Sequence, residues 1–101
     1  MIEAIEAATQ FVSGRPRSDL DSDQMLRFAL VRAIEIVGEA ASRISEPTRK
    51  IGAEIPWPLM VAMRNRLIHA YFDIDHDTLW KTVTEELPAL LPKLRDTLTT
   101  D

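Results

Sequence analysis

The stretch LRFALVRAIEIVGEAASRI, residues 26–44, indicates the fold more clearly than any other part of the chain. Its apolar side chains recur every three to four residues, which is typical of an amphipathic α-helix. A helix that is apolar on two sides packs against two neighbours, so we expect this one to contact two other helices. One stripe contains Leu26, Ala29, Ala33, Val37, Ala40 and Ile44, and a partial second stripe contains Phe28, Val31 and Ile36.

The same periodicity predicts three more helices. The first covers residues 2–13, with apolar Ile2, Ile5, Ala8 and Val12. The third covers about 57–72, with Leu59, Met63, Leu67 and Ala70. The fourth follows Asp75, with Leu79, Val83, Leu87, Leu91, Leu94 and Leu98.

Caps and helix breakers set the expected boundaries. Gly14 and Pro16 end the first helix, and residues 14–21 form a loop. Asp21 or Ser22 caps the second helix, which runs to about Ile44. Pro47 ends the second helix and opens a short helical turn at 47–51. Asp75 caps the fourth helix. Pro88 and Pro92 predict a kink or break near Leu87.

Composition indicates a single domain, residues 1–101, with 46% hydrophobic and 28% charged residues. No strand signal appears, so the expected fold is all-α, an antiparallel bundle of four main helices plus a short helical turn. Cysteine is absent, which excludes disulfides and thiolate chemistry. No apolar run approaches the ~20 residues of a membrane span, and the N-terminus does not resemble a signal peptide. We therefore expect a cytoplasmic protein.

The formal net charge of −4 is unusual for a general nucleic-acid-binding protein, which normally has basic excess. However, nine of the twelve basic residues are arginine, the side chain that binds phosphate bidentately. An acidic protein can still contain one basic cleft, and an enzyme that acts on one RNA bond needs no more.

Polar residues are concentrated in RNRLIHAY, residues 64–71, on the otherwise apolar third helix. Asn65 and Arg66 precede His69 by four and three residues, so both are its neighbours on a helix. Arg64 could hold phosphoryl oxygens and His69 could move a proton, while RNA supplies its own 2′-hydroxyl nucleophile without a metal. The alternative is a buried polar network that fixes helix register and has no catalytic role.

Two carboxylates, Glu35 and Glu39, lie one turn apart in the apolar second helix. If they are buried, Arg64 and Arg66 are the obvious partners; otherwise they form an exposed acidic stripe. Gly38 between them indicates close approach of another helix, because glycine costs a helix about 1 kcal/mol relative to alanine. A carboxylate metal site is disfavoured because no Glu-x-x-His motif accompanies them.

The second histidine, His76, lies between two aspartates at the start of the fourth helix. We expect it to be a solvated side chain.

The pattern Arg64-x-x-x-x-His69-x-Tyr71 resembles the R-x-x-x-x-H-x-Y motif of HepT-like HEPN proteins. The blocks AIEIVGEA (33–40), IPW (55–57) and MRNRLIH (63–69) resemble hallmarks of that family in the same order. The resemblance covers nearly the whole chain.

The resemblance implies a helical HEPN domain that acts as a homodimer, with Arg64 and His69 of both protomers facing a cleft. It implies a metal-independent endoribonuclease that needs no cofactor, the toxin of a toxin–antitoxin pair encoded beside an MntA-like nucleotidyltransferase antitoxin. Such an antitoxin can transfer AMP to the motif tyrosine, here Tyr71. Asn65 and Arg66 are supporting candidates.

A different class of function stays open at this point. The chain could be a non-catalytic helical module that binds a nucleotidyltransferase partner or a nucleotide. A purely structural bundle would instead leave Arg64 and His69 paired internally, away from any cleft.

Overall fold

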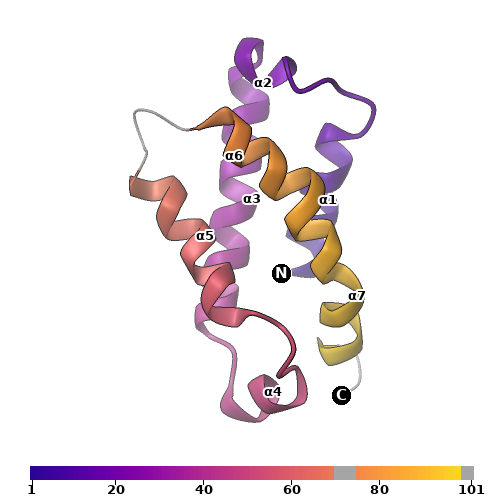
Figure 1. Cartoon of the computed structure of the whole chain (residues 1–101), viewed down its shortest axis with the longest axis vertical. Coiled ribbons are helices and arrows are strands. Elements are labelled where there is room, and N and C mark those ends of the chain that lie inside the picture. Colours follow the sequence, from indigo (N-terminus) through magenta and orange to yellow (C-terminus); the bar gives the residue numbers. More distant parts are fainter. Residues whose placement is uncertain (70–74, 99–101) are drawn as a thin grey trace.

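Helix α3, Gln24–Ser42, lies between α1, Ile2–Val12, and α5, Trp57–His69 (Figure 1). The structure, a computed structural model, describes residues 1–69 and 75–98, and only the backbone of 67–69. The most extensive contacts between elements are those of α3 with α5 and with α1. The prediction that this helix contacts two neighbours is therefore confirmed.

The C-terminal part of the described chain forms one continuous helical rod (Figure 1). It consists of α6, His76–Lys81, the π-helical segment η1, Thr82–Glu86, and α7, Leu87–Leu98. Both η1 and α7 pack against α1, whereas α6 contacts the short helix α2, Asp19–Ser22. Helix α4, Glu46–Ile51, lies at one end of the molecule. Every element in these ranges is helical, as predicted.

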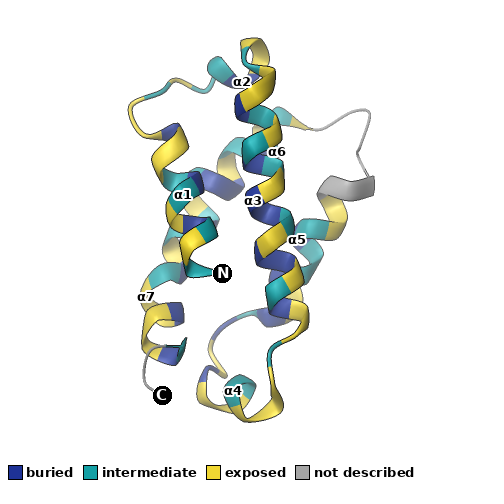
Figure 2. Ribbon diagram, turned by 180° about the vertical axis from the view of Figure 1, so that it is seen from behind, coloured by how far each residue is buried: buried dark blue, intermediate teal, exposed yellow. Residues whose placement is uncertain are grey.

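The core lies where α1, α3, α5 and the C-terminal rod meet, and the buried residues of each helix face inward (Figure 2). The predicted side of α1 is buried, including Ile5, Ala8 and Val12. The largest fully buried side chains are Ile5, Leu20, Leu30, Ile34, Met60, Leu79, Leu87, Leu94, Val37 and Val83. Four of these ten side chains belong to the C-terminal rod, so the rod contributes substantially to the core.

The predicted apolar face of α3 is partly wrong. Leu26, Ala33 and Val37 are buried as expected, but Leu30, Ile34 and Ala41 are buried in addition. Phe28 and Ile36 of the second stripe are exposed. The cause is that α3 is apolar around most of its circumference, so the packing of α1 and α5 decides which side is core. On α5, similarly, Met60 and Met63 are buried whereas Leu59 is exposed.

The cap of the long helix was predicted at the wrong residue. Asp23 is the N-cap, and its carboxylate accepts a hydrogen bond from the backbone N–H of Leu26 at 3.0 Å. Asp21 and Ser22 instead belong to α2, a turn of helix within the predicted loop. Helix α3 ends at Ser42, before Ile44, and Pro47 lies in the first turn of α4. The predicted short turn at 47–51 is thus confirmed.

The predicted break near Leu87 takes the form of a π-helical segment. Its last residue is Glu86, immediately before Leu87 and Pro88, and the chain stays helical throughout. Pro92 is accommodated inside α7. Asp75 caps α6 as predicted, since its carboxylate accepts from the backbone N–H groups of Asp77 and Thr78. The predicted extension of the third helix to Phe72 lies outside the described residues.

In the ranges 1–69 and 75–98, no helix combines the length and the apolar character that a membrane crossing requires.

Candidate functional site

Arg64 lies directly over Gly38 at the crossing of α5 and α3. A Cβ atom on Gly38 would lie less than 3.0 Å from the Cβ of Arg64, a separation that real Cβ atoms essentially never show. It would also lie 3.1 Å and 3.2 Å from Cδ and Cγ of Arg64. The prediction that Gly38 permits close helix approach is confirmed, and the helix that approaches carries the candidate catalytic arginine.

The guanidinium group of Arg64 is held by side chains of both helices. Its Nη1 donates to Glu39 Oε2 at 2.9 Å, while Nε and Nη2 donate to Asn65 Oδ1 at 3.3 Å and 3.2 Å. The Arg64 side chain is 23% exposed, so it is sheltered but accessible. A guanidinium has five N–H groups, and these contacts engage three of them. Within the described residues, the other two N–H groups have no partner.

The two carboxylates of α3 behave differently. Glu39 binds Arg64, one of the two partners predicted for it. Its other oxygen, Oε1, lies 2.7 Å from Nη2 of Arg43. Glu35 pairs with Arg32 on its own helix at 3.4 Å and with neither predicted partner. The Glu39 side chain is 50% exposed. Neither carboxylate is buried, as the alternative of an exposed acidic stripe predicts, although one of the predicted ion pairs, Glu39–Arg64, forms.

A surface hollow of ≈ 420 Å³ opens beside this ion pair, lined by Arg32, Glu35, Glu39 and Arg64. Arg32 and Arg43 were not singled out from the sequence. Their spacing from Glu35 and Glu39, three and four residues, was the signal that could have identified them. The site therefore has one sheltered arginine with more exposed arginines nearby on α3.

Arg66, the other supporting candidate, does not bind either carboxylate of α3. Its Nη2 lies 3.9 Å from Oε2 of Glu86, the last residue of the π-helical segment. That oxygen is buried and has no hydrogen-bond partner in the described part of the chain. Arg66 thus links α5 to the C-terminal rod by charge, separately from the Arg64 cluster.

The described part of α5 extends to His69, five residues after Arg64. Arg64 and His69 therefore belong to the same helix. The His69 side chain lies outside the described residues, and so does the whole of Tyr71. Their predicted roles are untested by the geometry.

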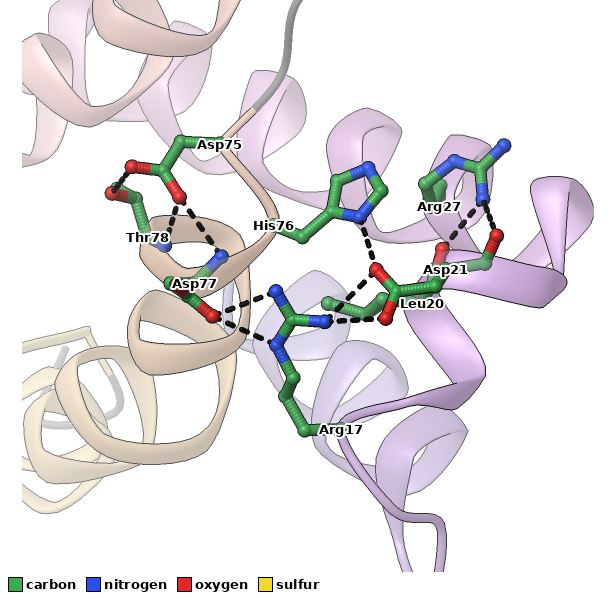
Figure 3. A network of polar contacts seen from close by, with 8 residues as sticks. All are labelled: Arg17, Leu20, Asp21, Arg27, Asp75, His76, Asp77 and Thr78. Carbon is green, nitrogen blue, oxygen red and sulfur yellow. Dashed lines mark hydrogen bonds and ion pairs between the residues drawn. The ribbon is translucent and has the colours of Figure 1, made fainter.

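His76 is not the solvated side chain expected from its position. Its Nδ1 lies 2.7 Å from Asp21 Oδ1, and Arg17 donates to both oxygens of Asp21 and to Asp77 (Figure 3). This network ties the loop around α2 to the start of α6. The hydrogen bond from His76, followed by that from Arg17, holds the pKa of the Asp21 carboxyl below its usual range.

The Arg64 cluster can bind and neutralise an anion, and the same helix carries His69. This combination suits phosphoryl chemistry, because arginine stabilises charge on phosphate oxygens while imidazole transfers protons.

Comparison with known proteins identifies the class. The family model of HepT-like ribonucleases matches residues 1–97. A protein of Thermococcus cleftensis named "Probable ribonuclease HepT" is 44% identical over 91 residues, which are 90% of this chain and 83% of that protein. A candidate RNase of Methanocaldococcus jannaschii is 37% identical over 90 residues, 89% of this chain and 83% of that protein. A candidate RNase of Caldanaerobacter subterraneus is 31% identical over 98 residues, which are 97% of this chain and 88% of that protein.

No solved structure matches the chain. The family match over nearly the full length and the identity to these relatives are sufficient for assignment. The chain belongs to the HepT-like ribonuclease family.

Proposed function

We propose that this chain is a metal-independent endoribonuclease and the toxin component of a HEPN/MNT toxin–antitoxin pair. Arg64 binds the scissile phosphate, and His69 acts as general acid or base. Asn65 and Glu39 position Arg64, and Arg66 adds positive charge on the same helix. The proposal rests on family membership together with the geometry of Arg64.

The reaction follows from these parts. One imidazole takes the proton of the 2′-hydroxyl, whose oxygen attacks the adjacent phosphorus. The bond from phosphorus to the 5′-oxygen breaks, and a protonated imidazole gives that oxygen a proton. The products are a 2′,3′-cyclic phosphate and a 5′-hydroxyl. In a homodimer, the two copies of His69 can serve as base and acid.

The observation that carries the proposal is the sheltered guanidinium of Arg64, fixed over Gly38 by Glu39 and Asn65. A preorganised donor loses little freedom when the charge on the phosphate develops, and such electrostatic stabilisation is usually the largest single catalytic contribution. Arg64 also lines the hollow of ≈ 420 Å³, where an anion would bind.

The test is to incubate the purified protein with cellular RNA in a metal chelator. We expect cleavage by the wild type and a loss of about 100-fold or more in Arg64→Ala. Arg95→Ala is the matched control, because Arg95 also pairs with a glutamate across two helices, at 2.8 Å from Glu6. Full activity of Arg64→Ala, or a requirement for metal, would remove this mechanism.

We further propose a homodimer formed through exposed apolar side chains of α3 and α5. Large apolar side chains are exposed there: Met25 at 79%, Phe28 at 60% and Leu59 at 52%. Large exposed apolar side chains of this kind often mark interaction surfaces. Arg64 lies where α5 crosses α3, so a dimer formed through these two helices would bring two copies of the site near one another.

Light scattering at micromolar concentration tests the dimer. We expect a dimer for the wild type and a monomer for Phe28→Glu. Phe11→Glu is the control, since Phe11 on α1 is 43% exposed but lies on another helix. A wild-type monomer, or loss of the dimer in the control alone, contradicts the proposed interface.

Control of the toxin is proposed to act through Tyr71 and an MntA-like nucleotidyltransferase antitoxin. AMP attached to Tyr71 would bring a bulky anion to the helix of Arg64 and Arg66, where it would compete with RNA phosphate. Intact-mass analysis after co-expression should show added AMP that vanishes in Tyr71→Phe. Neutralisation of Tyr71→Phe as efficient as that of the wild type would mean that the antitoxin inhibits by binding alone.

The second candidate is a non-catalytic module that binds a nucleotidyltransferase or a nucleotide. It would bind its partner normally but cleave no RNA, and Arg64→Ala would affect only complex formation.

A further inference from the structure

Three arginines surround the hollow at the outward face of α3. Arg32 and Arg43 lie on or next to α3, and Arg64 reaches in from α5. A second hollow of ≈ 350 Å³, lined by Arg32, Glu35, Ile36, Glu39, Ala40 and Arg43, adjoins the first and shares Arg32, Glu35 and Glu39 with it. The two hollows together follow α3 from Arg32 to Arg43.

Carboxylates of the chain itself already occupy these arginines. Arg64 and Arg43 donate to the two different oxygens of Glu39, at 2.9 Å and 2.7 Å. A phosphodiester likewise presents two charged oxygens, and a guanidinium fits phosphate as it fits carboxylate. Arg43 and Arg64 thus form an anion-binding site that the Glu39 carboxylate occupies in this structure.

The ion pairs at the two ends are easily exchanged. The side chains of Arg32 and Arg43 are 70% and 78% exposed, and the contact between Arg32 and Glu35 is long, at 3.4 Å. Exposed ion pairs of this kind contribute little to stability, so an incoming phosphate meets little resistance. Arg64, at 23% exposed, is the sheltered member.

The distance along the helix indicates the size of the ligand. Arg32 and Arg43 are eleven residues apart, which is roughly 16 Å along the axis of an α-helix. That length requires a strand with several phosphates rather than a mononucleotide. Three arginines against two glutamates also leave a local positive excess on a chain whose net charge is −4.

We propose that Arg32 and Arg43 are phosphate-binding subsites for single-stranded RNA, one on each side of the Arg64 site along α3. This inference rests on the proposed ribonuclease function and adds residues to it. Phosphates of the strand replace Glu35 as the partner of Arg32 and Glu39 Oε1 as the partner of Arg43, while Glu39 Oε2 keeps its contact with Arg64. A small part of an acidic protein then acts as its RNA-binding surface.

The experiment measures binding of a 5′-labelled single-stranded RNA by the His69→Ala protein over a range of salt concentrations. Arg32→Ala and Arg43→Ala are added singly and together, with Arg95→Ala as the matched control. We expect each subsite substitution to weaken binding about tenfold and to reduce the slope of log K against log salt by about 0.7. In the active protein, KM should rise while kcat changes little.

Several outcomes separate this inference from the ribonuclease proposal. If the wild type cleaves RNA but both substitutions match Arg95→Ala in slope and KM, the subsites are refuted and the enzyme stands. If the wild type binds RNA without cleaving it, and the substitutions weaken binding, the subsites stand and the enzyme is refuted. Substitutions that leave RNA binding intact but break the dimer would show that Arg32 and Arg43 contact the partner protomer and not RNA, which also overturns the subsites.

Discussion

Gly38→Ala tests the link between helix packing and the arginine site. The new Cβ would meet the Arg64 Cβ, an atom fixed to the backbone of α5, so no flexible side chain end can move aside. The two helices must separate by about 1 Å to restore an ordinary carbon–carbon contact of about 3.5 Å.

The expected magnitude is a balance of two effects. Alanine favours the helix by about 1 kcal/mol relative to glycine. Overpacking of a tight contact costs about 1–3 kcal/mol. We therefore expect a net loss of about 0–2 kcal/mol in the free energy of unfolding. Activity should fall much further, since a displacement of about 1 Å in a catalytic group can cost about 100-fold.

The assay combines urea denaturation with RNA cleavage, and Gly14→Ala is the control. Gly14 has a φ of +73° and nothing within 4 Å of a Cβ, so alanine there costs about 1 kcal/mol through backbone strain without touching α5. The control should lose similar stability but keep its cleavage rate. A Gly38→Ala protein that is more stable than the wild type and equally active would refute the reasoning.

Three further predictions concern the fold. Asp21→Asn should lower the free energy of unfolding at neutral pH, and its stability should converge with that of the wild type below about pH 4. The reason is that a carboxyl whose pKa is lowered by folding stabilises the fold above its unfolded pKa and loses that effect as the pH falls through its folded pKa. Acid titration followed by circular dichroism checks this. Trp57→Phe should cost about 1–3 kcal/mol in urea, since the buried indole Nε1 donates to the Gly52 carbonyl at 3.1 Å. Leu30→Ala should cost about 2–5 kcal/mol, whereas Ile51→Ala, 61% exposed, should stay within about 0.5 kcal/mol in the same assay.

The helices were predictable because their apolar periodicity and caps are local signals. Asp75 shows this well, since its carboxylate caps the two backbone N–H groups that follow it. The buried side of α3 was harder to predict. Ala29 and Leu30 are adjacent and both apolar, and only the positions of α1 and α5 decide that Leu30 is in the core.

The part of the site around Gly38 was predictable because a glycine inside a helix has few structural explanations. A glycine inside a helix has a cost, so close approach at Gly38 was a sound inference, and Arg64 proved to be the residue that approaches. The choice of ion pairs was less predictable, because Glu35 has a partner on its own helix in Arg32. The contact of His76 with Asp21 joins residues 55 positions apart, which no local pattern reveals.

The central claim is that His69 transfers protons during attack by the 2′-hydroxyl at a phosphate held by Arg64. The most direct measurement is the cleavage rate of a defined single-stranded RNA in a metal chelator, with analysis of the product ends, for the wild type and His69→Ala. We expect 2′,3′-cyclic phosphate and 5′-hydroxyl ends from the wild type, and a rate at least ~100-fold lower in the variant. Products with 3′-hydroxyl ends, or an undiminished rate in His69→Ala, would contradict the account.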